Sequence, residues 1–148
     1  MKKTTILFAA LVLFFAGSSY AFGPDKVSVF VKSAFERDFA KAANVTWTKT
    51  ANFYFADFTI GDKTVGAAYD EKGELTGTSE VIKASDLPAN VSAAIARKYA
   101  GYQLSDRITS VLYDGQTSYF FTVDSNKQRL DLSSDSEGNF TVRNKIKK

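Results

Sequence analysis

The chain contains one pattern twice: a segment with helical periodicity, followed by four short segments with strand periodicity. Apolar residues recur every three or four positions in residues 27–41, and residues 87–102 repeat that spacing. One constant offset, called the helix offset below, places Val31, Ala34, Phe35 and Phe39 on Val91, Ala94, Ile95 and Tyr99. The pattern therefore predicts two amphipathic helices of the same design.

The segments after each helix are rich in β-branched and aromatic residues and are separated by turn-forming pairs. They predict strands at residues 44–49, 52–60, 63–70 and 74–82, and again at residues 106–113, 117–124, 128–134 and 139–146. The turns between them are expected at Gly61-Asp62, Lys72-Gly73, Asp114-Gly115, Ser125-Asn126 and Glu137-Gly138. Short strands joined by tight turns form antiparallel meanders.

A second, larger offset relates the strands of the two copies and is called the strand offset. It places Tyr54-Phe55 on Tyr119-Phe120, and residues 70–73 on residues 135–138. The difference between the two offsets predicts that about five residues were inserted between the helix and the second strand of the later copy.

These patterns predict an α+β fold of two tandem helix-plus-four-strand units, at about residues 25–82 and 85–146. A unit of roughly 60 residues is too small to be stable alone. We therefore expect the units to share one antiparallel sheet of about eight strands, with the helices on one face. Ser85 or Asp86 is predicted to cap the second helix, with Pro88 in its first turn.

The alternation within the strands sorts their residues between two faces. The face that carries Tyr54, Ala56, Phe58, Tyr119 and Phe121 is uniformly apolar and is expected to pack against the helices, with Trp47 nearby. The other face mixes aromatic, charged and hydroxyl side chains, as protein-binding surfaces do. Its candidate binding residues are Phe53, Phe55, Asp57, Phe120, Thr122, Arg129, Asp131 and Arg143. Two alternatives stay open: the rings pack across neighbouring strands, or the two faces are exchanged.

Residues 1–21 have the features of a signal peptide. Lys2 and Lys3 precede an apolar run at residues 6–16, and the small residues Ser19 and Ala21 predict cleavage between Ala21 and Phe22. The run is about half of the roughly 20 apolar residues that span a bilayer. We therefore expect a periplasmic or secreted mature domain, residues 22–148, with no membrane span.

Composition restricts the chemistry of this domain. The sequence contains no cysteine and no histidine, which excludes thiol catalysis, disulfides and the usual general base near neutral pH. No phosphate loop or nucleophile elbow occurs, and no two carboxylates are grouped as a glycosidase requires. Residues 70–73 and 135–138 are too short for calcium loops and are expected to be hairpin turns. We expect no catalytic residues, no metal and no cofactor.

Charge also restricts the partners. Without Lys2 and Lys3 the 19 basic residues become 17, against 16 acidic residues, a net charge of +1. A nearly neutral, mixed surface does not indicate binding to nucleic acid. We expect a monomer whose partner is an envelope or secreted protein.

Several short motifs resemble those of a known family. They are Val45-x-Trp47, Tyr54-x-Ala56-x-Phe58, Ala67-Ala68-Tyr69-Asp70-x-x-Gly73, Leu87-Pro88-x-x-Val91 and Ala94-Ile95-x-x-x-Tyr99. Together they resemble the PepSY-like, β-lactamase-inhibitor-like (BLIP-like) proteins exported by Bacteroidetes-type bacteria. The resemblance implies a non-catalytic periplasmic domain that binds or inhibits another protein, and it supplies no functional residues. β-Lactamase inhibitory protein has disulfides, which this chain lacks, so a β-lactamase is not the expected target.

Three functions are compatible with these observations. The first is a binding module that uses the open sheet face to hold, and to inhibit or regulate, an envelope or secreted protein such as a peptidase. The second is a periplasmic carrier of a small or peptide ligand in the hollow between sheet and helix. The third is a hydrolase with an unrecognised acid pair.

Overall fold

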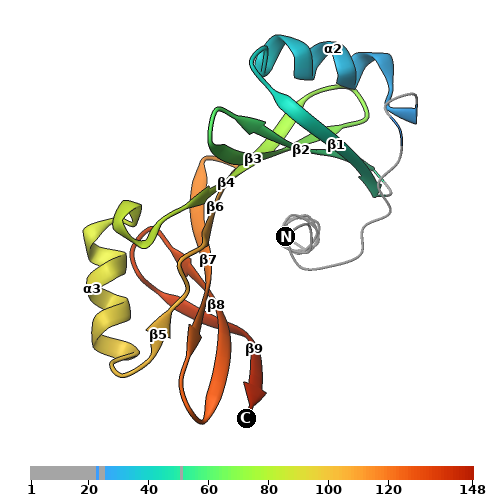
Figure 1. Ribbon diagram of the computed structural model, residues 1–148. Coiled ribbons are helices and arrows are strands. Elements are labelled where there is room, and N and C mark those ends of the chain that lie inside the picture. The colour runs from blue at the N-terminus through green and yellow to red at the C-terminus, as the bar shows by residue number, and fades with distance from the viewer. Residues whose placement is uncertain (1–22, 24–25, 51) are drawn as a thin grey trace. The chain divides into compact units, whose positions relative to one another are not determined.

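The computed structural model describes residue 23, residues 26–50 and residues 52–148. The predicted signal peptide and its cleavage site lie outside the described residues. The chain divides into two compact units, the first ending at Thr78 and the second beginning at Ser79 (Figure 1). The first contains helix α2 (Val29–Asp38), strands β1 (Ala43–Thr50), β2 (Phe53–Ile60) and β3 (Lys63–Asp70), and the start of β4 (Leu75–Ile82).

The second unit contains the end of β4 and repeats the same order of elements. A short 3-10 helix, η2 (Ala84–Asp86), precedes helix α3 (Ala89–Lys98). Strands β5 (Gln103–Leu104), β6 (Ile108–Tyr113), β7 (Gln116–Asp124), β8 (Gln128–Asp135) and β9 (Phe140–Lys147) follow. The predicted helices and the eight predicted strands are all present, and their bounds differ by a few residues.

Nine strands are hydrogen-bonded in the order β1-β2-β3-β4-β6-β7-β8-β9, with β5 paired to β7. The pairings within each unit are antiparallel. The α+β class and the antiparallel sheet are therefore confirmed. Strand β5 was not predicted, because its two residues are too few to show an alternating pattern.

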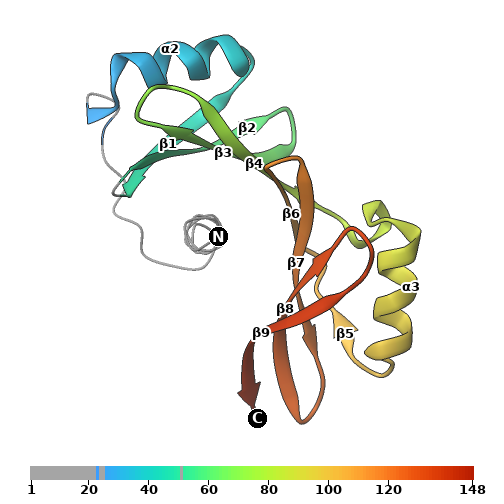
Figure 2. The same ribbon diagram turned by 180° about the vertical axis from the view of Figure 1, so that it is seen from behind.

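In the first unit α2 lies across one face of its strands (Figure 2). The buried side chains of the helix, Val31, Ala34 and Phe35, pack with the strand residues Trp47, Tyr54, Ala56, Phe58, Ala67 and Tyr69. Phe35 is central, because its ring lies 5.1 Å from Trp47 and 5.0 Å from Phe58, both edge to face. The prediction that Tyr54, Ala56 and Phe58 face the helix is confirmed.

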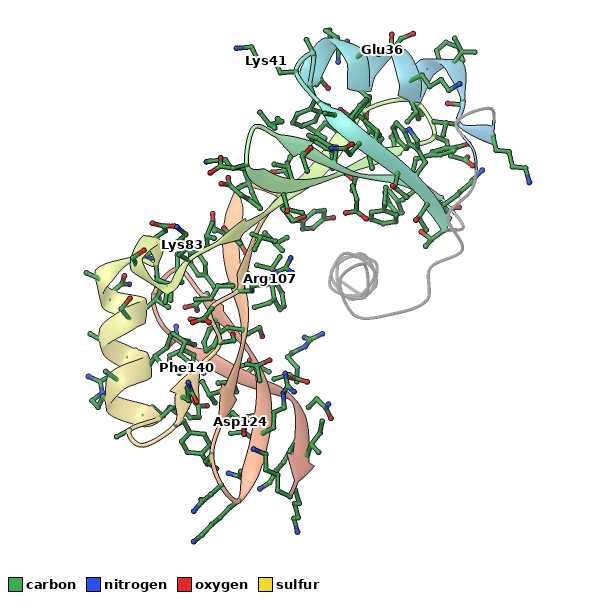
Figure 3. The ribbon with its side chains drawn as sticks, in the orientation of Figure 1. Glu36, Lys41, Lys83, Arg107, Asp124 and Phe140 are labelled. Carbon is green, nitrogen blue, oxygen red and sulfur yellow. The ribbon has the colours of Figure 1, made fainter. Side chains whose placement is uncertain are left out.

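The second unit has an equivalent core beneath α3. Val91 and Ile95 of the helix pack with strand residues, and Figure 3 shows side chains between α3 and the strands of this unit. These strand residues are Ile108, Tyr119, Phe121, Val123, Leu130 and Leu132. The prediction that Tyr119 and Phe121 belong to the core face is thus confirmed as well.

The two helices begin differently. Ser28 caps α2 by accepting a 3.3 Å hydrogen bond from the Val31 amide. The N-cap of α3 is Pro88, which offers no side-chain cap, so the prediction that Ser85 or Asp86 caps this helix is wrong. Leu87 and Pro88 are extended, with ψ of 145° and 141°. They separate Ser85 and Asp86 from the helix, and Asp86 instead accepts a hydrogen bond from the Lys83 amide.

The two turns related by the strand offset have matching hydrogen bonds. Asp70 Oδ1 accepts from the amides of Lys72 and Glu74 at 2.9 and 2.8 Å. Asp135 Oδ1 accepts from the amides two and four residues later, both at 2.9 Å. These carboxylates bind their own backbone, which supports the turn interpretation of both segments. Among the described residues no group of three acidic, histidine or cysteine side chains could hold a metal ion.

The strand register locates the extra residues of the second unit. Ala43 pairs with Thr59 in the first unit, and Gln103 pairs with Asp124 in the second. Ala43 and Gln103 are therefore equivalent, and they are still related by the helix offset. Thr48 pairs with Phe55 in the first unit, and Thr109 pairs with Phe120 in the second. The offset between Thr48 and Thr109 is one residue larger than the helix offset. One extra residue therefore lies before β6. The others are in the β6–β7 hairpin, which is longer by the pairs Leu112–Thr117 and Tyr113–Gln116.

Candidate functional site

The helix-free face of the first unit carries Phe53, Phe55 and Asp57 on β2. Phe53 is half-buried, and its ring centroid lies 6.5 Å from that of Phe55. Phe55 is only 1% exposed, so it does not present the open ring that the alternation predicted. Its cross-strand neighbours Thr48 and Ala68 are buried as well. The accessible part of this face therefore begins at Phe53 and Asp57.

Asp57 has a carboxylate oxygen without a partner. Its Oδ1 is buried and accepts no hydrogen bond in the described part of the chain. The residues paired with it are Thr46 on β1 and Gly66 on β3, and glycine has no side chain that could donate. Burial raises the pKa of Asp57 to about 7. At neutral pH this carboxyl group is thus poised between its two protonation states.

The second unit satisfies the equivalent position with its own side chains. The strand offset places Thr122 where the first unit has Asp57. Thr122 Oγ1 donates a 2.9 Å hydrogen bond to Asp131, and Asn144 Nδ2 donates to the other oxygen of Asp131 at 3.1 Å. Both carboxylate oxygens of Asp131 are therefore paired.

The remaining predicted binding residues also lie in the second unit. Phe120, Thr122 and Asp131 are half-buried, and Arg129 and Arg143 are exposed. Arg129 pairs across the strands with Asp124, whose pKa is lowered mainly by its contact with Lys148. Arg143 falls in the irregular part of β9, between the residues paired with Leu132 and Asp131. The structure joins Thr122 and Asp131 by a hydrogen bond, whereas among the described residues neither arginine forms a hydrogen bond or an ion pair with them.

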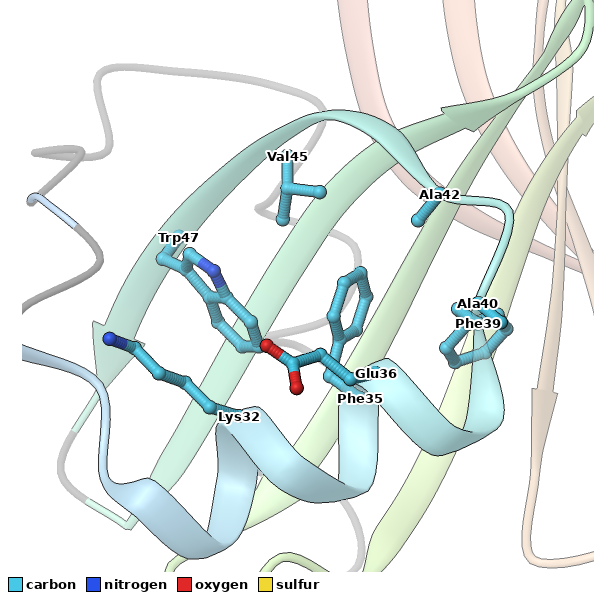
Figure 4. Close-up of a pocket in the computed structure, with 8 residues that line it drawn as sticks. All are labelled: Lys32, Phe35, Glu36, Phe39, Ala40, Ala42, Val45 and Trp47. Atoms are coloured by element: carbon cyan, nitrogen blue, oxygen red, sulfur yellow. The ribbon is translucent and has the colours of Figure 1, made fainter.

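A pocket of about 450 Å³ lies between α2 and β1 of the first unit (Figure 4). It is lined by Lys32, Phe35, Glu36, Phe39, Ala40, Ala42, Val45 and Trp47. The sequence predicted a hollow between helix and sheet as an alternative ligand site, but it did not identify these residues. The available signal was the combination of Trp47 with the aromatic residues Phe35 and Phe39 of the helix.

The rim of this pocket is charged. Lys32 and Glu36 are one helical turn apart on α2, and both side chains extend toward β1 in Figure 4. Neither forms an ion pair or side-chain hydrogen bond with another described residue. The pocket thus combines aromatic lining residues with one cation and one anion at its mouth, and neither charge is paired within the described part of the chain.

No protein-family model matches this chain, and no curated protein matches it. The chain is, however, similar to several solved structures. A BLIP-like protein from Bacteroides fragilis NCTC 9343 is 18% identical, with a TM-score of 0.68 over 86% of this chain and 90% of that one. A DUF2874 family protein from Bacteroides ovatus ATCC 8483 is 20% identical, with a TM-score of 0.68 over 83% and 89% of the two chains.

A third similar structure is a candidate periplasmic protein from Bacteroides eggerthii DSM 20697. It is 17% identical and has a TM-score of 0.69 over 82% of this chain and 88% of that one. At such identities the likeness shows that the fold is shared. In the part of the chain that the structure describes, no helix is both long enough and apolar enough to cross a membrane.

Proposed function

We propose that this chain is an exported, non-catalytic binding protein that holds a protein partner through the helix-free face of its first unit. The observation that carries the proposal is the buried oxygen of Asp57, which has no hydrogen-bond partner among the described residues. A buried acceptor without a donor costs roughly 1–3 kcal/mol, and a donor supplied by a ligand would remove this cost. A lysine or arginine side chain of the partner, inserted beside Phe53, would supply the donor.

Other observations support this proposal. The chain shares its fold with a BLIP-like protein and with a candidate periplasmic protein, and residues 1–21 have the features of a signal peptide. A sequence without histidine or cysteine has few groups for catalysis at neutral pH. The resemblance to PepSY-like proteins points to an envelope or secreted protein, such as a peptidase, as the partner.

Capture from a periplasmic extract of the native host tests the proposal. Three tagged proteins are compared: wild type, Phe53→Ala/Asp57→Asn, and the control Asp62→Asn. Asp62 is an exposed residue of the β2–β3 turn, so the control makes the same chemical change away from the face. We expect a partner that binds wild type and the control but not the double variant.

Purified partner then allows a direct measurement. The double variant should bind at least about tenfold more weakly, because one charged hydrogen bond and one aromatic contact are lost. If the double variant and wild type bind every captured protein equally, the face around Asp57 is not the binding surface.

A second candidate function is a carrier of an apolar or peptide ligand. The pocket between α2 and β1 favours it, because a volume of about 450 Å³ and an aromatic interior are typical of ligand sites. This function uses a different surface of the first unit, so the two can be tested separately.

A further inference from the structure

The backbone that follows each helix forms the same hydrogen bond in both units. The pocket of the first unit can therefore be compared with the equivalent position in the second. The helices correspond residue by residue at the helix offset, Val31 to Val91. The amide of Ala42 donates to the carbonyl of Phe39 at 2.9 Å, and the amide of Tyr102 donates to the carbonyl of Tyr99 at 3.0 Å. Ala42 and Tyr102 are therefore equivalent residues at the exit of the helix.

In the second unit this position is filled by an aromatic ring. Tyr102 packs against the core, with its ring 5.8 Å from that of Tyr99 and edge to face. Tyr99 is the equivalent of Phe39, which lines the pocket of the first unit. The hydroxyl group of Tyr102 accepts a hydrogen bond from the side chain of Gln128 on β8. At the equivalent residue the first unit has only the methyl group of Ala42, which lines the pocket.

The charged rim is also particular to the first unit. The helix offset places Ser92 and Ala96 at the positions of Lys32 and Glu36. The second helix folds and covers its core without these charges. Lys32 and Glu36 are therefore not required by this helix–sheet packing.

The pocket also adjoins a free strand edge. β1 is the last strand of the order on its side and pairs only with β2 among the described strands. An edge strand next to a helix can accept an extended peptide, which adds main-chain hydrogen bonds and places alternate side chains in a groove. A peptide main chain offers carbonyl oxygens to an ammonium group such as that of Lys32, and N–H groups to a carboxylate such as that of Glu36.

We infer that the pocket between α2 and β1 binds an aromatic side chain presented by an extended segment of a partner polypeptide. The ring contacts Ala42, the small residue whose equivalent in the second unit is Tyr102. Lys32 and Glu36 contact the main chain on either side of it. This inference rests on the second candidate function, gives it a ligand class, and does not depend on binding at Asp57.

Fluorescence of the single tryptophan tests it, because Trp47 lines the pocket and no other tryptophan contributes. The probe is the capped peptide acetyl-Gly-Ser-Phe-Ser-Gly-amide, which contains neither tryptophan nor tyrosine. We expect a saturable change of Trp47 emission. The peptide with alanine in place of phenylalanine should bind about tenfold more weakly or worse, because burial of the ring is lost.

Two variants close the pocket by different routes. Ala42→Tyr copies the second unit, and Val45→Phe fills the pocket from β1; each should weaken binding of the phenylalanine peptide by about tenfold or more. Val142→Phe is the matched control, because Val142 is an exposed valine on the other terminal strand, β9. It should bind like wild type, and so should Asp57→Asn. Circular dichroism shows that each variant is folded, and Val45→Phe remains as the test if Ala42→Tyr is not.

Several results would each overturn the inference. They are no saturable response of Trp47, equal binding of the alanine peptide, unchanged binding by the folded pocket variants, and equally tight binding of N-acetylphenylalanine amide. The last result would identify a site for small aromatic molecules and not for a peptide. Loss of binding in Asp57→Asn would assign the peptide to the sheet face instead.

Discussion

Thr122 donates a 2.9 Å hydrogen bond to Asp131, the residue directly opposite it on the neighbouring strand. The same place in the first unit pairs Asp57 with Gly66. In the first unit the carboxylate is on the strand that carries the threonine in the second unit, and the glycine opposite it has no side chain that could donate. One unit thus carries a satisfied carboxylate on its helix-free face, while the other carries an unsatisfied one.

Asp57 should therefore destabilise the protein at neutral and higher pH. Burial raises its pKa in the folded state to about 7, whereas an unfolded aspartate has a pKa near about 3.9. Between about pH 4 and 7 the folded state holds more protons, so its contribution to stability falls as the pH rises and is constant above about 7. Asp57→Asn should remove this dependence and raise stability above pH 7 by about 1–2 kcal/mol, since partial exposure screens the charge.

Urea unfolding of wild type and Asp57→Asn across this pH range gives the measurement. Only the difference between the two proteins is diagnostic, because other groups titrate in both. A variant that is more stable yet loses its partner would show a trade-off between stability and function. A difference that does not change with pH would mean that the carboxyl group of Asp57 is not perturbed.

Gly73 and Gly138 should be difficult to replace in both units. Each has a positive φ, +83° and +89°, and a Cβ would lie 2.8 Å from the Phe30 carbonyl oxygen at Gly73 and 3.1 Å from the Ala94 side chain at Gly138. Gly73→Ala should cost about 2–3 kcal/mol, because backbone atoms must move, and Gly138→Ala somewhat less. Urea midpoints rank the two variants, and the opposite ranking would contradict the geometry.

The carboxylates of the two matching turns should contribute to stability in the same manner. Asp70→Ala removes the acceptor of two backbone amides and should cost about 1 kcal/mol, and Asp135→Ala should show a similar loss. The hydrogen bond from the Asn139 side chain and those from backbone amides lower the pKa of Asp135. The carboxylate of Asp135 therefore contributes to stability at pH values above its pKa in the unfolded state. This contribution is lost as the pH falls through its pKa in the folded state.

A pH series of urea midpoints for Asp135→Ala and wild type checks the last point. The two curves should converge in acid. Asp106→Ala, at an exposed bend of the same unit, is the control, and an equal loss there would show that any exposed loop aspartate has this effect.

Tyr69 should contribute through its hydroxyl group as well as its ring. The residue is fully buried, and Oη donates a 3.1 Å hydrogen bond to the carboxylate of Asp38 at the end of α2. Tyr69→Phe should cost about 1–2 kcal/mol, since the acceptor is charged. Thermal unfolding of Tyr69→Phe, of Asp38→Asn and of the double variant separates the hydrogen bond from other effects. If the two single losses simply add, the two groups do not interact.

Much of this fold could be predicted from the sequence because its periods are regular. Phe35, Tyr54 and Phe58 fall on the core face by simple periodicity, and the turns at Gly73 and Gly138 follow from local chemistry. The capping prediction at Ser85 failed because Leu87 and Pro88 are extended and the helix begins only at Ala89. The spacing of the apolar residues does not show where the helix begins.

The candidate sites were less predictable because they depend on neighbours distant in the sequence. Alternation places Phe55 opposite the helix, but it does not reveal that Thr48 and Ala68 flank it and are themselves buried. The unsatisfied oxygen of Asp57 follows from its register with Gly66, which is fixed only when β2 and β3 pair. The pocket is lined by residues of α2, of the loop after it and of β1, which come together only in the folded unit.

The difference between Ala42 and Tyr102 has an evolutionary consequence. A chain that contains one unit twice can carry a different residue at the same position of each unit without changing the shared fold. A relative with a small residue at both helix exits should have a pocket in both units, and one with a large residue at both exits should have none. A single codon in each half of the gene would distinguish these forms.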